Sequence, residues 1–330
     1  MIVRRFYEPQ LAQYSYLIGC PATRSAIVID PVRDADQYIE TAAAANLRIT
    51  HVTETHIHAD FVSGTRELVA RTGATMLLSG EGVPEWRYAF AETDGAQLLR
   101  NGDMIDVGRI RITAQHTPGH TPEHLSGRVK DLATAGEPVA IATGDFVFVG
   151  DVGRPDLLER VANEVGTMEA SARQLFASLA RIRKLPDYLQ IWPGHGAGSA
   201  CGKSLGDMPS STVGYERRAN WALSERDADA FVERVLEGQP EPPPYFSVMK
   251  KLNRDGPPVL GDRGAPAKPP AEALAELGRA GALVVDIRSP DRFARAHIPG
   301  TLNIPWGSSF TTLAGSLLPY DHDLYLLSDE

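Results

Sequence analysis

Short apolar runs separated by turn residues alternate with amphipathic stretches along the first two thirds of the chain. Apolar runs rich in β-branched residues predict strands, and apolar positions spaced by three and four predict helices. The predicted strands are 14–19, 26–30, 47–53, 75–78, 139–145 and 189–192 with a hairpin over 102–113, and the predicted helices are 34–45, 167–184 and one that begins at 65. Asp34 is placed to cap the first helix. Strands followed by helices, repeated along the chain, indicate sheets covered by helices.

The composition changes after Gly238, where prolines become dense. Proline-rich segments of this kind are typical of linkers. A helix over 271–280 and a strand over 283–286 are predicted beyond it. We therefore expect a first domain over residues 1–238, a proline-rich linker over 239–270 and a second α/β unit over 271–330.

The overall composition is that of a soluble globular protein with two domains, because 43% of the 330 residues are hydrophobic and 23% are charged. A net charge of −9 argues against nucleic-acid binding, and no apolar run approaches the roughly 18 residues of a membrane span. The N-terminus turns polar at Arg4, unlike a secretory signal, and the two cysteines, Cys20 and Cys201, fit a reducing compartment. We expect a cytoplasmic homo-oligomer that binds neither nucleic acid nor membrane.

Metal-capable side chains concentrate where the predicted strands end. They are His56, His58, Asp60, His120, Asp145 and His195. An isolated His-x-His pair also occurs on surface turns, but several strand ends that meet at one edge of a sheet favour a metal site. Imidazole and carboxylate ligands together suit zinc or iron better than calcium.

The chain resembles the metallo-β-lactamase superfamily over residues 1–235 through four motifs in order, which are THIHAD at 55–60, TPGHT at 117–121, TGD at 143–145 and PGH at 193–195. This resemblance implies an αββα sandwich with the metal at one edge of the sheets. Residues 149–157 and 194–203 are similar to the persulfide dioxygenase branch. Enzymes of that branch use one non-haem iron and O2 to oxidise a low-molecular-weight thiol persulfide to sulfite and the thiol.

The resemblance implies that one Fe(II) per chain is bound by His56, His120 and Asp145. Two histidines and one carboxylate leave coordination positions open for O2 and substrate. The residues expected to orient these ligands or nearby waters are His58, Asp60 and His195.

Phe61 stands where two-metal members of the superfamily carry a further histidine. A second metal would keep only Asp60, His195 and a bridging Asp145, which favours a single metal. The rival function is a zinc-dependent thioester hydrolase of the glyoxalase II type with the same three ligands, since a lone zinc also generates hydroxide near neutral pH.

Three further residues are candidates for the catalytic site. Arg154 faces the substrate in the resembled branch, where a guanidinium grips a carboxylate such as that of glutathione; the alternative is a structural arginine paired with Asp151 or Asp156. Asp156 is expected to support this loop. Cys201 lies close after His195 and would carry a persulfide if its thiolate were exposed, which gives a third function as a sulfur carrier or sensor; otherwise it is a small buried residue.

Residues 271–330 resemble a rhodanese domain through Val284–Pro290, Phe293 and His297–Pro305. A rhodanese transfers sulfane sulfur through a cysteine at the end of the next central strand. The matching strand here leads to Ser328, whose hydroxyl cannot form a persulfide. We expect an incomplete and inactive rhodanese-like unit, and its fusion to the first domain favours sulfur chemistry over hydrolysis.

Overall fold

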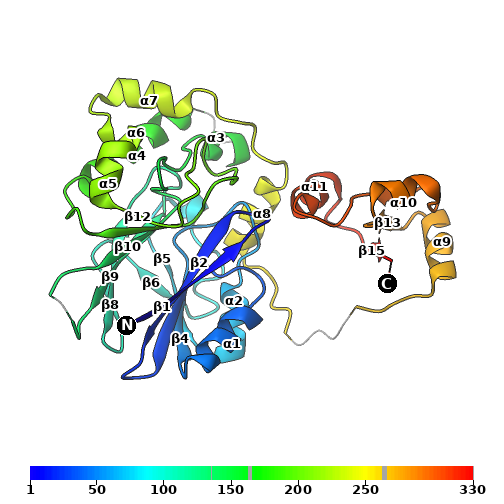
Figure 1. Ribbon diagram of the computed structural model, residues 1–330, viewed down its shortest axis with the longest axis horizontal. Coiled ribbons are helices and arrows are strands. Elements are labelled where there is room, and N and C mark those ends of the chain that lie inside the picture. Colours follow the sequence, from blue (N-terminus) through cyan, green and yellow to red (C-terminus); the bar gives the residue numbers. More distant parts are fainter. Residues whose placement is uncertain (135, 163–165, 262–265, 330) are drawn as a thin grey trace. The chain divides into compact units, whose positions relative to one another are not determined.

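The computed structural model describes residues 1–134, 136–162, 166–261 and 266–329. The chain divides into two compact units, Met1–Gly261 and Asp262–Glu330. In the first unit, two mixed β-sheets lie face to face with helices on both outer sides (Figure 1). This is the αββα sandwich that the motifs implied.

The first sheet contains six strands in the order β1-β2-β3-β4-β5-β6. They are β1 (Ile2–Glu8), β2 (Gln13–Cys20), β3 (Ser25–Ile29), β4 (Arg48–Thr53), β5 (Thr75–Ser79) and β6 (Gln97–Leu99). The strands β1 to β3 pair antiparallel, and β3 to β6 pair parallel. Along β2, Tyr16 and Ile18 point into the space between the sheets and Leu17 packs on the outer helices, because side chains alternate along a strand.

The second sheet has the order β12-β11-β10-β9-β8-β7. Its strands are β7 (Met104–Val107), β8 (Ile110–His116), β9 (Leu125–Asp131), β10 (Ala140–Gly144), β11 (Gln190–Pro193) and β12 (Ser211–Thr212). Neighbours are antiparallel except for the parallel pair of β10 and β11. Ala142 faces the first sheet, whereas Ile141 and Ile191 face the helices outside, so both faces of these strands are buried.

Amphipathic helices close the two outer faces. They are α1 (Asp36–Ala44) and α2 (Thr65–Thr72) on the first sheet, and α4 (Met168–Ile182), α5 (Val213–Ala219), α6 (Trp221–Ser224) and α7 (Ala228–Leu236) on the second. Leu175, Leu179 and Ile182 of α4 form an apolar stripe against β10 and β11. The sequence pattern of α4 therefore predicted both the helix and its buried face.

Part of the range predicted as linker is helical and belongs to the first unit. Residues 246–255 lie inside the range predicted as linker, yet they form helix α8 (Phe246–Asp255). Phe246 packs in an apolar cluster with Phe148 and Leu157, the latter from α3 (Leu157–Ala162). The prolines on either side do not prevent this, because a helix needs only a short proline-free stretch with one apolar face.

The second unit contains a three-stranded parallel sheet in the order β14-β13-β15. Its elements are α9 (Ala271–Arg279), β13 (Leu283–Asp286), α10 (Pro290–Arg295), β14 (Leu302–Asn303), α11 (Phe310–Leu317) and β15 (Leu324–Leu327). Asp286, which ends the central strand, accepts hydrogen bonds from the backbone N–H and the guanidinium of Arg288. This ion pair fixes the turn that the rhodanese-like motif contains.

The strands and helices predicted in the first two thirds of the chain are present, with small differences at their ends. The pattern missed the strands β1 and β9, which carry several charged residues, and the short strands β6 and β12. It also missed the helices α3, α5, α6 and α7. The cap of α1 also differs: the N-cap residue is Ala35, while Asp34 accepts a hydrogen bond from the N–H of Asp36 at 3.1 Å. Asp34 therefore accepts from one free N–H of the helix, but it lies one residue before the N-cap position instead of at it.

Gly119, in the TPGHT motif, provides a test of the packing between this loop and α4. Its φ is +143°, and an added Cβ would lie 2.5 Å from the Cα of Leu175. Gly119→Ala is expected to lower the free energy of unfolding by about 2–3 kcal/mol, since backbone must move to relieve the overlap. Gly136→Ala is the control, because a Cβ there meets no atom within 4 Å. Urea unfolding of both variants measures the difference, and equal stability of the two would contradict this packing.

Candidate metal centre

Four strand ends deliver the predicted ligands to one place. The loop after β4 carries His56, His58 and Asp60, the turn between β8 and β9 carries His120, and Asp145 and His195 follow β10 and β11. All six side chains are buried. The two sheets therefore hold these polar groups inside the protein, where each needs a partner.

His56, His120 and Asp145 form the first group of donors. Their donor atoms lie within 4.8 Å of one another. The Nε2 atoms of His56 and His120 lie 3.9 Å and 3.6 Å from Oδ2 of Asp145. Metal–ligand bonds of about 2.0–2.2 Å fit between donors at such separations.

Hydrogen bonds at the far side of each imidazole determine which nitrogen faces the centre. The Thr55 hydroxyl donates to Oδ2 of Asp30 at 2.9 Å and can therefore accept from Nδ1–H of His56, also at 2.9 Å. Nδ1–H of His120 donates to the carbonyl of Arg154 at 3.0 Å. Both rings then present an unprotonated Nε2 to Asp145, as metal ligation requires. Burial lowers the pKa of both histidines, which keeps them neutral.

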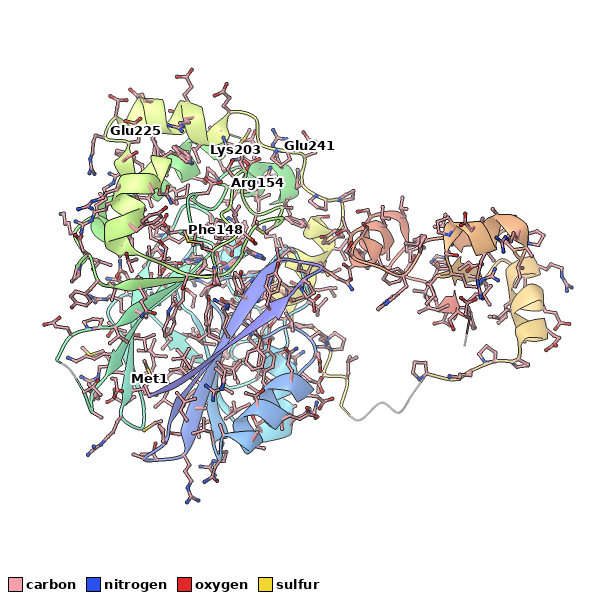
Figure 2. All side chains as sticks on the ribbon, viewed as in Figure 1. Met1, Phe148, Arg154, Lys203, Glu225 and Glu241 are labelled. Atoms are coloured by element: carbon pink, nitrogen blue, oxygen red, sulfur yellow. The ribbon has the colours of Figure 1, made fainter. Side chains whose placement is uncertain are left out.

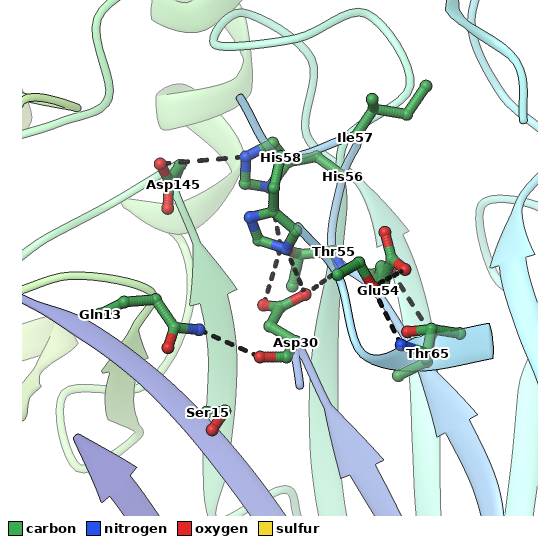
Figure 3. A network of polar contacts seen from close by, with 12 residues as sticks. Gln13, Ser15, Asp30, Glu54, Thr55, His56, Ile57, His58, Thr65 and Asp145 are labelled. Carbon is green, nitrogen blue, oxygen red and sulfur yellow. Dashed lines mark hydrogen bonds and ion pairs between the residues drawn. The ribbon is translucent and has the colours of Figure 1, made fainter. Parts of the chain in front are cut away.

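Asp30, at the end of β3, organises the loop after β4 (Figure 3). Its carboxylate accepts from the backbone N–H of Thr55 at 2.6 Å and from Nε2 of His58 at 3.1 Å. Burial lowers the pKa of His58, but the carboxylates of Asp30 and Asp60 outweigh this and raise it to about 9. The Nδ1 of His58 has no hydrogen-bond partner among the described residues, and the contact of Nε2 with Asp30 fixes the orientation of the ring.

Unsatisfied buried atoms indicate that a cation belongs at this centre. Among the described residues, no N–H or O–H group donates to either carboxylate oxygen of Asp145 or of Asp60. Nε2 of His195 is also buried without a partner. Buried carboxylates are strongly destabilising unless they are paired or coordinate a metal. The donor set of imidazoles and carboxylates fits a transition metal of the iron or zinc type.

A second group of donors adjoins the first and consists of Asp60, His195 and Cys201, again within 4.8 Å of one another. Nε2 of His195 lies 3.3 Å from Asp60 and 3.5 Å from Asp145. The sequence motifs predicted only Asp60, His195 and a bridging Asp145 as donors to a second metal. The structure adds the thiol of Cys201, and no local pattern pointed to it as a donor.

The environment of Cys201 differs from that of a reactive cysteine. The side chain is buried, and burial together with the carboxylates of Asp145 and Asp60 raises the pKa of the thiol well above its usual value. A sulfur carrier needs an exposed, stabilised thiolate. This geometry does not meet the condition on which the carrier function depended, and it corresponds to the alternative of a small buried residue.

Arg154 has no exposed surface and lies in the interior of the first unit (Figure 2). Its guanidinium donates two hydrogen bonds to Asp156, at 2.8 Å and 2.7 Å, and others to the carbonyls of Ala200 and Pro240. The structure therefore corrects the predicted substrate contact in favour of the structural alternative. Arg154 instead acts through its backbone, because its carbonyl orients His120. Asp156 holds this arginine by accepting those two hydrogen bonds.

Asn253 of α8 was missed by the sequence analysis, although it supports the loop that carries His56. Its side-chain amide donates to the carbonyls of His58 and Phe61 and accepts from the N–H of Ser63, at 2.7–2.9 Å. The residue stands about 190 positions along the chain from its partners, inside the predicted linker. No local sequence signal indicates such a contact. Asp30, by contrast, followed a predicted strand, as the ligands do.

An apolar wall borders the second donor group. Its members are Ala59, Phe148, Leu157, Val161, Ala200, Cys201, Leu205, Tyr245, Phe246 and Met249. The ring of Phe148 lies 6.1 Å from that of His195, and Phe61 packs on His58 at 4.4 Å. The centre is therefore enclosed by apolar side chains, which exclude water and strengthen electrostatic interactions inside it.

Comparison with known proteins agrees with this architecture. The profile of the metallo-beta-lactamase superfamily matches residues 9–195, and the chain belongs to this superfamily. A rhodanese-like domain profile matches residues 269–327. Among the described residues, no helix has the length and apolar character needed to cross a bilayer.

Three relatives of the chain carry different functional names. A beta-lactamase hydrolase-like protein of Xylella fastidiosa is 30% identical over an alignment of 256 residues. The match covers 70% of this chain and 54% of that protein, so it spans about half of that relative. A hydroxyacylglutathione hydrolase of Methylococcus capsulatus is 27% identical over 81% of this chain and 92% of that protein. The mitochondrial persulfide dioxygenase ETHE1 of Bos taurus is 28% identical over 68% of this chain and 76% of that protein.

Two solved structures are similar to the chain. A metallo-beta-lactamase of Staphylococcus aureus has a TM-score of 0.87 at 41% identity, covering 100% of this chain and 92% of that one. ETHE1 of Myxococcus xanthus has a TM-score of 0.62 at 28% identity, covering 77% and 98%. The predicted fold and the resemblance to the persulfide dioxygenase branch are confirmed, whereas the individual ligand assignments stay predictions.

Asn253 gives a test of the support behind the metal loop. Asn253→Ala removes three hydrogen bonds from buried backbone groups and is expected to lower metal affinity by about 10- to 100-fold. Competition with a metal chelator measures the affinity. Lys251→Ala, an exposed position on the same helix, should leave it unchanged. Equal affinity in both variants would contradict the supporting role of Asn253.

The two cysteines are expected to differ in reactivity. Burial raises the pKa of Cys20, but hydrogen bonds from Thr23 and from the N–H of Arg109 outweigh it and lower the pKa to about 7. Both cysteines are buried, at 3% and 2% exposure, but Cys20 adjoins the exposed turn 21–24. Brief opening of this turn should let alkylation modify Cys20 first, with a rate that rises as the pH passes through about 7, while Cys201 reacts only after unfolding. Mass spectrometry of the labelled peptides identifies the modified residue. Preferential labelling of Cys201 would show that its site is open.

Proposed function

We propose that the first unit is a mononuclear non-haem iron persulfide dioxygenase. It oxidises a low-molecular-weight thiol persulfide, RSSH, with O2 and water to the thiol RSH and sulfurous acid, H2SO3. The observation that carries this proposal is the buried set of two histidines and one carboxylate, His56, His120 and Asp145. That set, with open positions, is typical of Fe(II) oxygenases. The similarity to ETHE1 of Bos taurus supports the same reaction.

The residues around the centre have distinct tasks in this proposal. When bound by His56, His120 and Asp145, Fe(II) supplies open coordination positions at which O2 and a sulfur ligand meet. Thr55 and the carbonyl of Arg154 hold the two imidazoles in the ligating tautomer. This fixed orientation avoids reorganisation during the reaction, which is how a rigid outer layer assists catalysis.

The apolar wall and Phe61 favour a sulfur substrate. Phe61 cannot coordinate a metal, and Tyr245, Phe246 and Met249 bring apolar surface close to the second donor group. A polarizable, weakly hydrated sulfur atom loses less on entering such a site than a charged oxygen nucleophile does.

Thioester hydrolysis is the second candidate, because of one specific observation. Asp60, His195 and Cys201 form a second donor group beside the first, and two-metal sites activate water for hydrolysis. The relative from Methylococcus capsulatus is a hydroxyacylglutathione hydrolase. Metal content separates the candidates, since hydrolysis requires zinc or a similar ion and no O2.

The decisive experiment measures metal content and O2 uptake on the full chain purified without oxygen. We expect iron at one per chain and rapid O2 uptake when glutathione persulfide is added. His120→Ala should lower the rate by at least about 100-fold, since it removes one ligand. His51→Ala is the matched control, because His51 is half buried outside both donor groups and bonds only to Thr50 among the contacts described.

The outcomes distinguish the candidates. Persulfide-dependent O2 uptake with formation of sulfite, lost in His120→Ala and kept in His51→Ala, supports the dioxygenase. Bound zinc with cleavage of a glutathione thioester and no O2 uptake would replace it with the hydrolase.

A further inference from the structure

A cavity of about 30 Å³ lies between the two sheets of the first unit, beneath the metal centre. Aliphatic side chains from both sheets line it, among them Ile27, Leu77, Ile105 and Ile112. These four are at least nine-tenths buried, so the cavity lies in the interior of the sandwich. A space of this size holds one water or one small molecule of two heavy atoms.

The polar groups in the lining are already bonded elsewhere. The Thr55 hydroxyl is engaged with Asp30 and His56, and the carboxylate of Glu54 accepts from Ser63 and Tyr88. A buried water needs two to four polar partners. Because this lining leaves so few, an apolar molecule fits the cavity better than water does, as in other dry cavities between aliphatic side chains.

The same lining adjoins the ligands. Thr55 borders the cavity, and its hydroxyl contacts the imidazole of His56 at 2.9 Å. The cavity therefore lies one residue behind a ligand of the centre. From the solvent side the ligands are enclosed, since His56, His120 and Asp145 are each at most 2% exposed. A small apolar molecule in this cavity lies on the core side of the ligands, so it would not compete with a thiol persulfide for the same space.

We propose that this cavity is a binding site for dioxygen, held beside Thr55 and one residue behind His56 before it reacts. This inference rests on the proposed dioxygenase function for the identity of the gas. That the cavity is apolar follows from its lining and does not depend on the proposed function. Dioxygen is apolar, has two heavy atoms and is poorly hydrated, which matches the size and chemistry of the cavity.

Xenon tests the site independently of any activity. In xenon-pressurised crystals of the metal-loaded full chain, a xenon atom is expected between Ile27 and Ile112. It should be absent from Ala114→Val, which places two methyl groups into the cavity from β8. An ordered water at this position, or no xenon in the unaltered protein, would overturn the proposal whether or not the protein is a dioxygenase.

Oxygen kinetics test the identity of the gas. Ala114→Val is expected to raise the KM for O2 by about threefold or more, with kcat and the KM for persulfide unchanged, because only the site for the gas is filled. Ala142→Val, which fills the cavity from β10, is a second variant in case the first is unstable. Ala26→Val is the matched control, since Ala26 is a buried strand residue that faces the outer helices.

Each kinetic result decides a separate claim. A KM for O2 that is equal in the filled variants and in Ala26→Val would overturn the assignment to dioxygen even if xenon binds. If the unaltered protein takes up no O2 with persulfide, the proposed function fails, and the assignment to dioxygen fails with it. Xenon binding in that case still identifies an apolar cavity, so the two failures are distinguishable.

Discussion

The carboxylate of Asp145 is the group on which the rest of the first unit depends. It is fully buried at the end of β10, and no N–H or O–H group of the described residues donates to it. Three imidazole nitrogens, from His56, His120 and His195, lie 3.5–3.9 Å from the same oxygen. Burial raises the pKa of this carboxyl, but positive charge beside it, first of all at His195, outweighs the effect and lowers it. An ionised, unpaired group in the interior is stable only with a cation beside it.

The two sheets and their loops serve to hold this arrangement together. Strands from both sheets end at the centre, so its geometry depends on the packing of the whole sandwich. Behind the ligands, Asp30 and Thr55 fix one histidine, and the carbonyls of Arg154 and Ala12 fix two others. Rigid orientation of this kind presents the donor atoms to a metal ion without rearrangement of the protein. The contact between its carbonyl and His120 also explains why Arg154, which has no exposed surface, lies so close to the site.

Local sequence patterns were sufficient for most of the central strands and for the metal-capable residues that follow them. The strand before Asp145 is a continuous apolar run, and histidines placed directly after such strands must meet at one edge. The pattern could not show that Arg154 faces inward, because that depends on Ala200 and Pro240, which are distant in sequence. Asn253 was missed for the same reason. Its surroundings are rich in proline, and its role comes entirely from contacts with a loop about 190 positions away.

The substitution Asp145→Asn tests the central claim, that a buried carboxylate requires a cation, most directly. Chemical unfolding of this variant and of the unaltered chain, each with and without Fe(II), gives four stabilities. Without metal, Asp145→Asn should be the more stable of the two, because it removes an unpaired buried charge. With Fe(II), the unaltered chain should become the more stable, since binding to the folded state adds stability that the variant lacks. An equal gain from Fe(II) in both proteins, or a metal-free variant less stable than the unaltered chain, would contradict the account.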